Sequence, residues 1–522
     1  MSAETINEMI KVCQYVGVTR KSVSVSGDIV LQDIKPDILS IVKITRDVCV
    51  LNKVAEENRV RVDGTIDIGI IYIADDESNS VRSVNSQIGF SEIVELQGIR
   101  ENSIIDLKVT AGNVEYRVAN GRKVSVKVPL TFDVTAFNNC EINIVKGISN
   151  DSDMQIQKVE KMISTPLMQN FTEVELKENI KLNDEMPAIA EILTSSMNIV
   201  NKEYKLSYNK ILAKADANVR VIYIADNERQ SIETFETTIP VMGFIEADNI
   251  NENSNISINY SIKSFPTRPV YQDLNANTIC VDANIDVVAY SCECRNVELI
   301  TDFYTPNAVL RTENESMNVL QNLITQTEHI DLSQTLVVPE LDNTNILSID
   351  GNVSINERNV LNGKVAIAGN IDVNVFYNRK DSRTVENKKL ELPFQQVIRA
   401  DGLSGNSNPI ITTSIESIAF NVVGENQIQV NIKLEVEVIA NTEEKIDTVS
   451  RLDVTDENVP QMPSIVVYYV KEGDSLWKIA KRFNNTVGYI KEINDLKDDT
   501  IYPGQRLLIP RLQSQENIKA LM

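Results

Sequence analysis

The stretch "IGIIYIADDE", residues Ile68–Glu77, occurs in this chain more than once. It returns as "VRVIYIADNE" from Val219 and, in a weaker form, as "VNVFYNRKDS" from Val373. The tyrosines of the copies are separated by 151 and 154 residues: Tyr72, Tyr223 and Tyr377. Recurrence of one pattern at a nearly constant period indicates repeated copies of a single folding unit. The sequence therefore predicts a triplicated domain.

Two more sets of residues keep this period. They are the prolines that open each copy, Pro36, Pro187 and Pro339, and the alanines at the expected end of one strand in each copy, Ala136, Ala289 and Ala440. Before each alanine, apolar residues alternate with smaller or more polar ones, which is typical of a strand with one buried face. We expect three mainly antiparallel β-sandwich or barrel-like domains. A short helix near "KPDILSIV" and "MPAIAEIL" is left open.

Composition and charge limit the classes of partner and the location expected for this chain. The chain has 522 residues, a net charge of −23, and 42% hydrophobic and 24% charged residues, as in soluble globular proteins. Such an acidic chain is a poor ligand for nucleic acid or anionic lipid. No apolar run is long enough to span a bilayer, and Glu4 and Glu8 stand where a secretory signal would carry basic residues. We expect a cytoplasmic protein without an integral membrane segment.

The residues that usually carry catalysis are sparse. The chain has no GxxxxGK, GxSxG or HExxH motif and a single histidine, His329, which argues against phosphate-loop, triad and zinc-protease chemistry. The six cysteines are dispersed, and Cys292 and Cys294 alone are too few for a zinc site. The acidic run Asp75–Glu77 is typical of a solvated loop. We expect no catalytic residue, metal or cofactor, although a carboxylate pair inside one β domain remains an alternative.

The tail differs from the repeats. After a proline-containing linker, "YYVKEGDSLWKIAKRF" runs from Tyr468 to Phe483 and holds the only tryptophan, Trp477. A strand is followed by a turn in which Asp474 or Ser475 can cap a helix. The apolar residues of that helix fall at i, i+3, i+4 and i+7: Leu476, Ile479, Ala480 and Phe483. A second helix and a closing strand that ends at Pro510 complete a small βααβ unit.

This tail resembles the LysM domain along nearly the whole family pattern. The matching residues are Tyr468, Val470, Gly473, Asp474, Ser475, Leu476, Ile479, Ala480, Phe483, Ile490, Asn494, Leu496, Ile501, Gly504, Gln505, Leu507, Ile509 and Pro510. Most LysM domains bind N-acetylglucosamine polymers such as peptidoglycan. The resemblance implies a groove between two loops, lined here by Gly473, Asp474, Ser475, Leu476, Ile501, Tyr502 and Pro503. Several of these residues also suit the turn, the cap and the core.

The tail offers two candidate contacts for a protein partner, a basic cluster and the tryptophan. Residues Val466–Arg511 carry eight basic and six acidic side chains on an otherwise acidic chain. The cluster Lys478, Lys481 and Arg482 is a candidate docking face for an acidic partner, the alternative being an ordinary solvated helix face. Trp477 is expected either to pack in the core of the tail or to anchor an interface.

Acidic β repeats followed by one LysM domain are similar to the spore-coat morphogenetic proteins with SPOCS domains. The resemblance implies a non-enzymatic adaptor whose LysM domain binds the coat ATPase SpoIVA, in the mother-cell cytoplasm at the forespore outer membrane. Further coat proteins are expected partners, and self-association is left open. The rival function is peptidoglycan binding. The expected divisions are an N-terminal segment (1–20), three SPOCS-like domains (21–150, 168–310 and 325–453), a linker (454–464), the LysM domain (465–512) and a tail (513–522).

Overall fold

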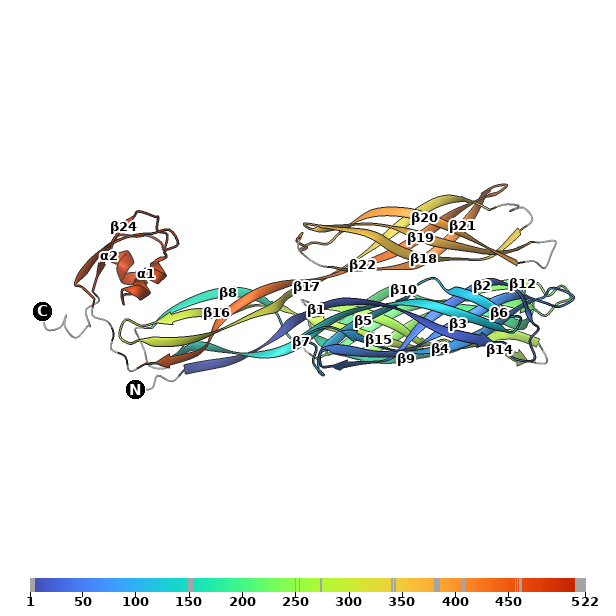
Figure 1. Cartoon of the computed structure of the whole chain (residues 1–522), viewed down its shortest axis with the longest axis horizontal. Coiled ribbons are helices and arrows are strands. Elements are labelled where there is room, and N and C mark those ends of the chain that lie inside the picture. Colours follow the sequence, from blue (N-terminus) through green and yellow to red (C-terminus); the bar gives the residue numbers. More distant parts are fainter. Residues whose placement is uncertain are drawn as a thin grey trace.

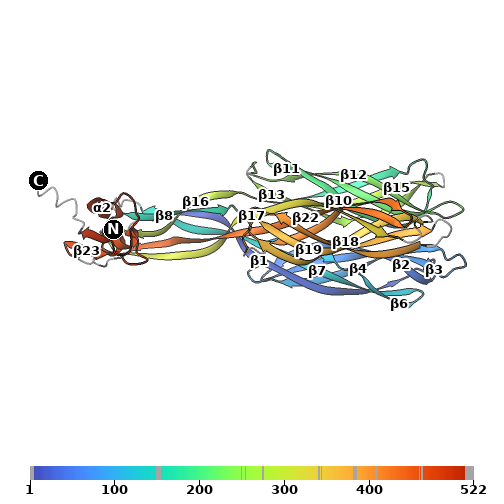
Figure 2. The same cartoon turned by 90° about the horizontal axis from the view of Figure 1, so that it is seen from above.

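The computed structural model describes residues 5–511 except 149–153, 249, 253, 273–274, 339–340, 342–343, 380–384, 406–408, 456, 458 and 460–461. The molecule is elongated (Figure 1). Three β domains lie side by side at one end, paired strands run from them as a stalk, and a small α+β domain lies at the far end of the stalk (Figures 1 and 2). The expected fold class, three β repeats followed by a small α+β domain, is confirmed.

Each β domain consists of two antiparallel sheets around an apolar core. In the first domain the sheets are β1 (Thr5–Val30), β5 (Ile104–Ala111), β6 (Glu115–Asn120) and β7 (Lys123–Ile148), and β2 (Ile38–Glu56), β3 (Arg59–Ala74) and β4 (Val81–Glu95). In the second they are β9 (Met168–Lys181), β13 (Asn255–Ser264), β14 (Thr267–Gln272) and β15 (Asn275–Cys292), and β10 (Ile189–Ser207), β11 (Lys210–Ala225) and β12 (Ile232–Glu246). In the third they are β17 (Leu310–Val337), β21 (Ile410–Gly424) and β22 (Gln427–Val454), and β18 (Thr344–Leu361), β19 (Lys364–Arg379) and β20 (Val385–Arg399).

The repeated tyrosine and proline contact each other. The Tyr72 hydroxyl donates to the carbonyl oxygen of Pro36 at 3.1 Å, and Tyr223 donates to that of Pro187 at 3.0 Å. Both rings are fully buried, so the bond satisfies a hydroxyl that would otherwise be costly to bury. Tyr377 of the third copy donates instead to Glu386 at 2.8 Å; Pro339 lies outside the described residues.

The structure decides the open question of a short helix and corrects the expected strand ends. "KPDILSIV" and "MPAIAEIL" form no helix, because the residues after each proline enter β2 and β10 and pair with β3 and β11. Their isoleucines and valine are β-branched and suit a strand. The strands also do not end near Ala136 and Ala440, because β7 and β22 continue well beyond those alanines.

These continuations build the stalk. We define the stalk as three antiparallel pairs: residues 5–16 of β1 with 137–148 of β7, β8 (Gln155–Ser164) with β16 (Cys294–Tyr304), and residues 310–323 of β17 with 441–454 of β22. Each pair continues from one β domain. Side chains of all three pairs share one apolar core: Ile10, Val12, Ile142, Ile144, Ile163, Val297, Leu299, Val319 and Ile446.

The stalk changes two expected boundaries. Residues 5–20, expected as a separate N-terminal segment, are the first part of β1 and pair with β7 into the first domain, with register shifts at Ile6/Asn7 and Tyr15/Gly17. Residues 154–167 and 311–324, expected to lie between domains, belong largely to β8 and β17. An isolated pair of strands is marginal in water, so these segments gain their stability by packing three pairs together.

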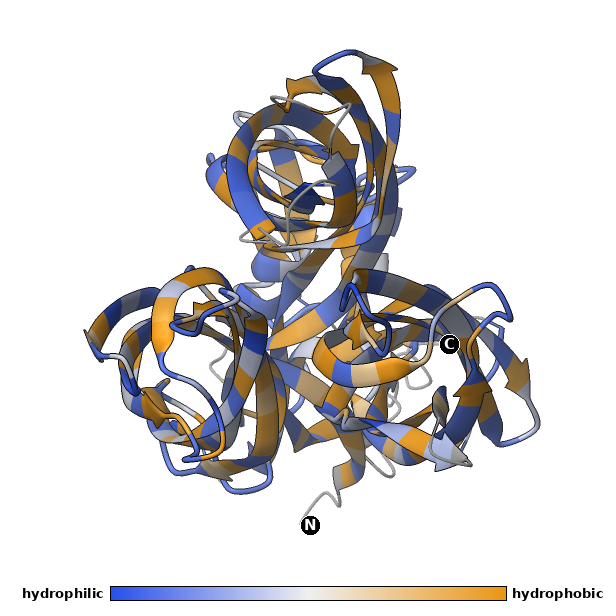
Figure 3. Cartoon of the chain, turned by 90° about the vertical axis from the view of Figure 1, so that its right-hand side faces the viewer, coloured by the Kyte–Doolittle hydropathy of each residue, from blue (hydrophilic) through white to orange (hydrophobic). Residues whose placement is uncertain are grey.

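The three β domains meet at a common apolar junction. In Figure 3 they surround a shared axis. The residues directly before the repeated tyrosines, Ile71, Ile222 and Phe376, are buried in one cluster there. Strand β3 alternates between buried and more exposed residues until Ile70, Ile71 and Tyr72 are buried in succession, since its second face is covered by the neighbouring domains. A continuous apolar run of this kind is typical of a strand buried on both faces.

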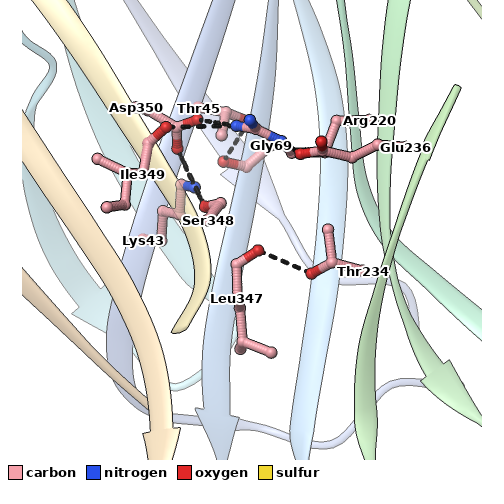
Figure 4. Close-up of polar contacts among 10 residues, drawn as sticks. All are labelled: Lys43, Thr45, Gly69, Arg220, Thr234, Glu236, Leu347, Ser348, Ile349 and Asp350. Atoms are coloured by element: carbon pink, nitrogen blue, oxygen red, sulfur yellow. Dashed lines mark hydrogen bonds and ion pairs between the residues drawn. The ribbon is translucent and has the colours of Figure 1, made fainter. Parts of the chain in front are cut away.

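One ion cluster joins the three domains beside this junction. Asp350 of the third domain accepts from Lys43 of the first and, at 3.1 Å, from Arg220 of the second (Figure 4). Counted from the repeated tyrosines, the other copies carry neutral residues at each of these positions: Thr194 and Ser348 for Lys43, Gly69 and Asn374 for Arg220, and Thr45 and Ser196 for Asp350. Because each charged residue occurs in one copy only, this ion cluster forms in only one arrangement of the three similar domains.

The cluster makes the junction sensitive to acid. Burial acts to raise the pKa of Asp350, but Lys43 and Arg220 outweigh it and hold that pKa below 3.8. A carboxylate whose folded pKa is depressed contributes stability above its unfolded pKa, and this contribution is lost as the pH falls through the folded value. We expect the first thermal unfolding transition to drop steeply below pH 3.8, and to drop less in Asp350→Asn. The transition temperature is measured by circular dichroism as a function of pH. An equal fall with pH in both proteins would contradict this assignment.

Candidate functional site on the tail domain

The tail domain has the predicted βααβ order. It consists of β23 (Ile465–Tyr469), α1 (Leu476–Arg482), α2 (Val487–Ile493) and β24 (Arg506–Pro510), with the two strands paired antiparallel. Each helix has only seven residues, too few to persist alone. The Ser475 hydroxyl caps α1 by accepting from the Lys478 amide at 3.2 Å, and Thr486 caps α2 by accepting from Tyr489 at 3.1 Å.

The two expected groove loops are held together at their base. The Val470 amide donates to the Gln505 carbonyl at 2.9 Å, and the Gly504 amide donates to the Val470 carbonyl at 2.8 Å. Gly473 and Gly504 have φ of +82° and +85°, in the left-handed region that favours glycine. A Cβ at either position would have no neighbour within 4 Å, so both loops face open space.

Three of the expected groove residues are used by the fold itself. The Asp474 carboxylate accepts from the Lys471 amide and from the Tyr468 hydroxyl, both at 2.8 Å, and these bonds lower the pKa of Asp474. Ser475 is the cap of α1, and Leu476 is buried in the core. Gly473, Tyr502 and Pro503 are exposed, and Ile501 is half-buried. A ligand in this groove would meet mainly Tyr502, Pro503 and loop backbone.

The three residues of the expected basic face, Lys478, Lys481 and Arg482, each make a different contact. Lys481 donates to Asp302 of the stalk at 2.6 Å. Lys478 turns back to the Gly473 carbonyl at 3.0 Å. Arg482 lies over the Phe483 ring, 5.7 Å from its centroid. The three side chains therefore do not form one continuous docking patch.

Trp477 lies between the tail domain and the stalk. Its indole N–H donates to Asp302 at 2.9 Å, and its ring packs edge-on against Tyr304 with centroids 4.8 Å apart. Tyr304, the last residue of β16, is buried within the core cluster of the tail domain. We call the contact formed by Asp302, Tyr304, Trp477 and Lys481 the stalk contact. The sequence left core packing and an interface role open for Trp477, and it held no sign of an intramolecular partner.

An uncovered apolar face was not foreseen. The outward side of the β23–β24 sheet carries Ile465, Val467, Tyr469 and Leu508, with 65, 52, 61 and 37% of their surface exposed. Val467 pairs directly with Leu508. The run "IVVYYV" (residues 465–470) alternates two sets of apolar residues, so whichever set faces the helices, the other must face outward. This double apolar pattern was the available signal.

A cavity of about 1370 Å³ with a mixed polar and apolar lining lies among the three β domains. Charged side chains from all three line it, and many pair with each other: Lys202 with Glu435, Lys263 with Asp286, and Lys433 with Glu416, at 2.7–2.9 Å. His329 lies 3.0 Å from Glu416. Within the described ranges, no group of three or more His, Cys, Asp or Glu residues is placed to hold a metal ion. Of these pairs, Lys202 with Glu435 joins the second domain to the third, and the others lie within one domain.

Comparison with protein families identifies both parts of the chain. The SPOCS domain of SipL matches residues 37–119, 188–267 and 342–423, and the LysM domain matches residues 468–510. The chain belongs to the SipL family. Its three SPOCS domains and its LysM domain confirm the resemblance seen in the sequence. Both kinds of domain are non-catalytic binding modules, and SipL membership points to a role in the spore coat.

The curated relatives of this SipL-family chain match it through their LysM regions. The probable endopeptidase p60 of Listeria grayi is 37% identical over 68 residues, which are 13% of either chain. The probable peptidoglycan endopeptidase LytE of Bacillus subtilis is 50% identical over 40 residues, 8% of this chain and 12% of LytE. The uncharacterized protein YkzQ of Bacillus subtilis is 49% identical over 43 residues, 8% of this chain and 57% of YkzQ. The chain thus spans less than two thirds of each.

No solved structure matches the chain. Among the residues that the structure describes, no helix has the length and apolar character needed to cross a membrane.

Proposed function

We propose that this SipL-family chain is a non-enzymatic adaptor of spore-coat assembly. Its LysM domain docks a SpoIVA-like coat ATPase, and its three SPOCS domains bind further coat proteins. The proposed place of action is the mother-cell face of the forespore outer membrane. This chain makes and breaks no bond, so any ATP is hydrolysed by the partner.

The observation that carries this proposal is the uncovered apolar face of the LysM sheet. Ile465, Val467, Tyr469 and Leu508 offer side chains that gain free energy when another protein surface removes them from water. A sugar polymer rich in hydroxyl groups would not need this face, which lies on the sheet and not between the two groove loops. The acidic remainder of the chain leaves the LysM domain as its basic module.

The elongated shape suits an adaptor. The LysM domain and the SPOCS domains lie at opposite ends of the molecule (Figure 1). A stalk pair of about 12 residues extends roughly 40 Å at the usual rise per residue. Partners bound at the two ends can therefore be held near each other without competing for the same surface, and their effective mutual concentration rises.

Replacing Val467 with glutamate tests the docking face. The charge would have to be desolvated in the complex, so we expect at least about tenfold weaker binding of the full chain to a SpoIVA-like ATPase. Val397→Glu is the matched control, because Val397 is 56% exposed on β20 of the third domain, and it should bind normally. Circular dichroism checks folding, and affinity is measured by interferometry. Equal affinities of both variants would remove the support for this face.

The second candidate function is binding of peptidoglycan. It is favoured by the LysM likeness to LytE, a probable peptidoglycan endopeptidase, and by the open loops around Tyr502. Co-sedimentation of the full chain with insoluble peptidoglycan distinguishes the two. Sedimentation that Tyr502→Ala abolishes, together with no binding to the ATPase, would replace the adaptor proposal with this one.

A further inference from the structure

The stalk occupies one face of α1. Trp477 and Lys481 are four residues apart on a helix, so their side chains project from the same side. Both donate to a single carboxylate, Asp302 on β16: the indole N–H to Oδ2 at 2.9 Å and the ammonium to Oδ1 at 2.6 Å. Asp302 therefore satisfies two groups of the LysM domain from a position about 175 residues earlier in the chain.

Tyr304 completes the contact and also weakens it. Only 5% of this residue is exposed, although it belongs to a stalk strand, because the LysM core covers it. Within the described structure its hydroxyl has no hydrogen-bond partner, and burial raises its pKa. A buried hydroxyl without a partner would regain hydrogen bonds to water on exposure. Opening the stalk contact thus relieves one unfavourable burial while it exposes an aromatic ring.

The polar half of the contact is only moderately strong. The side chains of Asp302 and Lys481 are 25 and 43% exposed, so water and salt screen their attraction. The stalk contact as defined joins two residues of α1 to two residues near the end of β16. Such a contact can be populated in the free chain and still be displaced by a competing surface.

We propose that the stalk contact is an autoinhibitory closure of the LysM domain. In the free chain, Asp302 and Tyr304 hold the α1 face that carries Trp477 and Lys481, and a partner that uses this face must displace them. The chemistry that can do so is the chemistry of the stalk itself, a carboxylate placed beside an aromatic ring on a protein surface. This inference rests on the proposed docking of a coat ATPase, and it extends the surface that the ATPase contacts from the outward sheet face to this α1 face.

Two conservative substitutions should change the population of the stalk contact in opposite directions. Asp302→Asn removes the charge that attracts Lys481 and should open the contact. Tyr304→Phe removes the unpartnered hydroxyl while keeping the ring, and should close it further. Glu298→Gln is the control, because Glu298 lies on the same strand and pairs with Lys158 of the stalk instead of the LysM domain.

Trp477 reports on the contact directly, since it is the only tryptophan of the chain. In the full chain, we expect the acrylamide quenching constant to rise about twofold in Asp302→Asn and to fall in Tyr304→Phe, with Glu298→Gln unchanged. The affinity for a SpoIVA-like ATPase should rise about threefold or more in Asp302→Asn and fall in Tyr304→Phe.

Other results would contradict either the stalk contact or its proposed role. Unchanged quenching in both variants would show that the LysM domain is not held on the stalk in solution. Altered quenching with unchanged affinity would show that the contact exists but does not keep the ATPase from the α1 face. If no variant and no wild-type chain binds the ATPase, the proposed function fails, while quenching still decides whether the stalk contact forms.

Discussion

Replacing Phe376 with alanine is expected to lower the free energy of unfolding by about 3–5 kcal/mol. The Phe376 ring is fully buried at the junction of the three β domains, where it packs with Ile71 and Ile222. The Lys43 ammonium lies over it, 5.1 Å from the ring centroid. Truncation therefore removes apolar contacts to two other domains, leaves a cavity, and takes away the ring face that partly compensates a buried charge.

The control for this prediction is Phe420→Ala. Phe420 lies on β21 of the same domain and is 38% exposed, so its truncation should cost about 1 kcal/mol or less. Thermal and urea unfolding measured by circular dichroism give the comparison. Limited proteolysis adds a second readout, because loss of the junction should expose the SPOCS domains to cleavage between them. Similar destabilisation by both variants would argue that the three domains do not pack on Phe376.

Replacing Asp350 with alanine is expected to cause the second large loss of stability. The Lys43 ammonium is only 7% exposed, and in Asp350→Ala it keeps only the Ser348 hydroxyl, at 3.0 Å, from this cluster. Arg220 loses one of its two carboxylate partners. Breaking a buried ion pair from one side usually costs more than the pair contributes. We expect a loss of about 2–4 kcal/mol, seen as a lower first unfolding transition.

A double variant separates the lost pair from the buried charge. Lys43→Met with Asp350→Leu removes both charges and should be more stable than Asp350→Ala alone, because no charge is left unpaired at that position. Glu391→Ala, an exposed acidic position on β20, should leave the transition unchanged. A double variant that is less stable than Asp350→Ala would contradict the view that the unpaired Lys43 causes the loss.

Local patterns predicted the elements of this protein well. The period of two before Ala136, Ala289 and Ala440 is a property of each strand by itself, so it indicated three β units that the SPOCS matches confirm. In the tail, the cap at Ser475 and the helical spacing of Leu476, Ile479 and Ala480 lie within a few residues of each other. The LysM domain could therefore be predicted from short-range sequence alone, and its match confirms it.

The expected binding residues were less well placed. Asp474, Ser475 and Leu476 were expected in a groove, and the structure uses all three for the loop, the cap and the core. A motif residue can be retained for folding or for contact, and its position in the motif does not separate the two. The outward face of Val467 and Leu508 was readable from the doubled apolar pattern of the first strand, but it was not recognised.

The sequence by itself determined the β character of the repeats, their number, and the order of strands and helices in the tail, because these follow from the repeat period and from side chains two to four residues apart. Only the tertiary structure decided what covers the apolar faces of these elements. Ile71, Ile222 and Phe376 meet across about 150 residues of chain, and Trp477 meets Asp302 across 175. Such contacts depend on which whole surfaces fit together, and no local period records that choice.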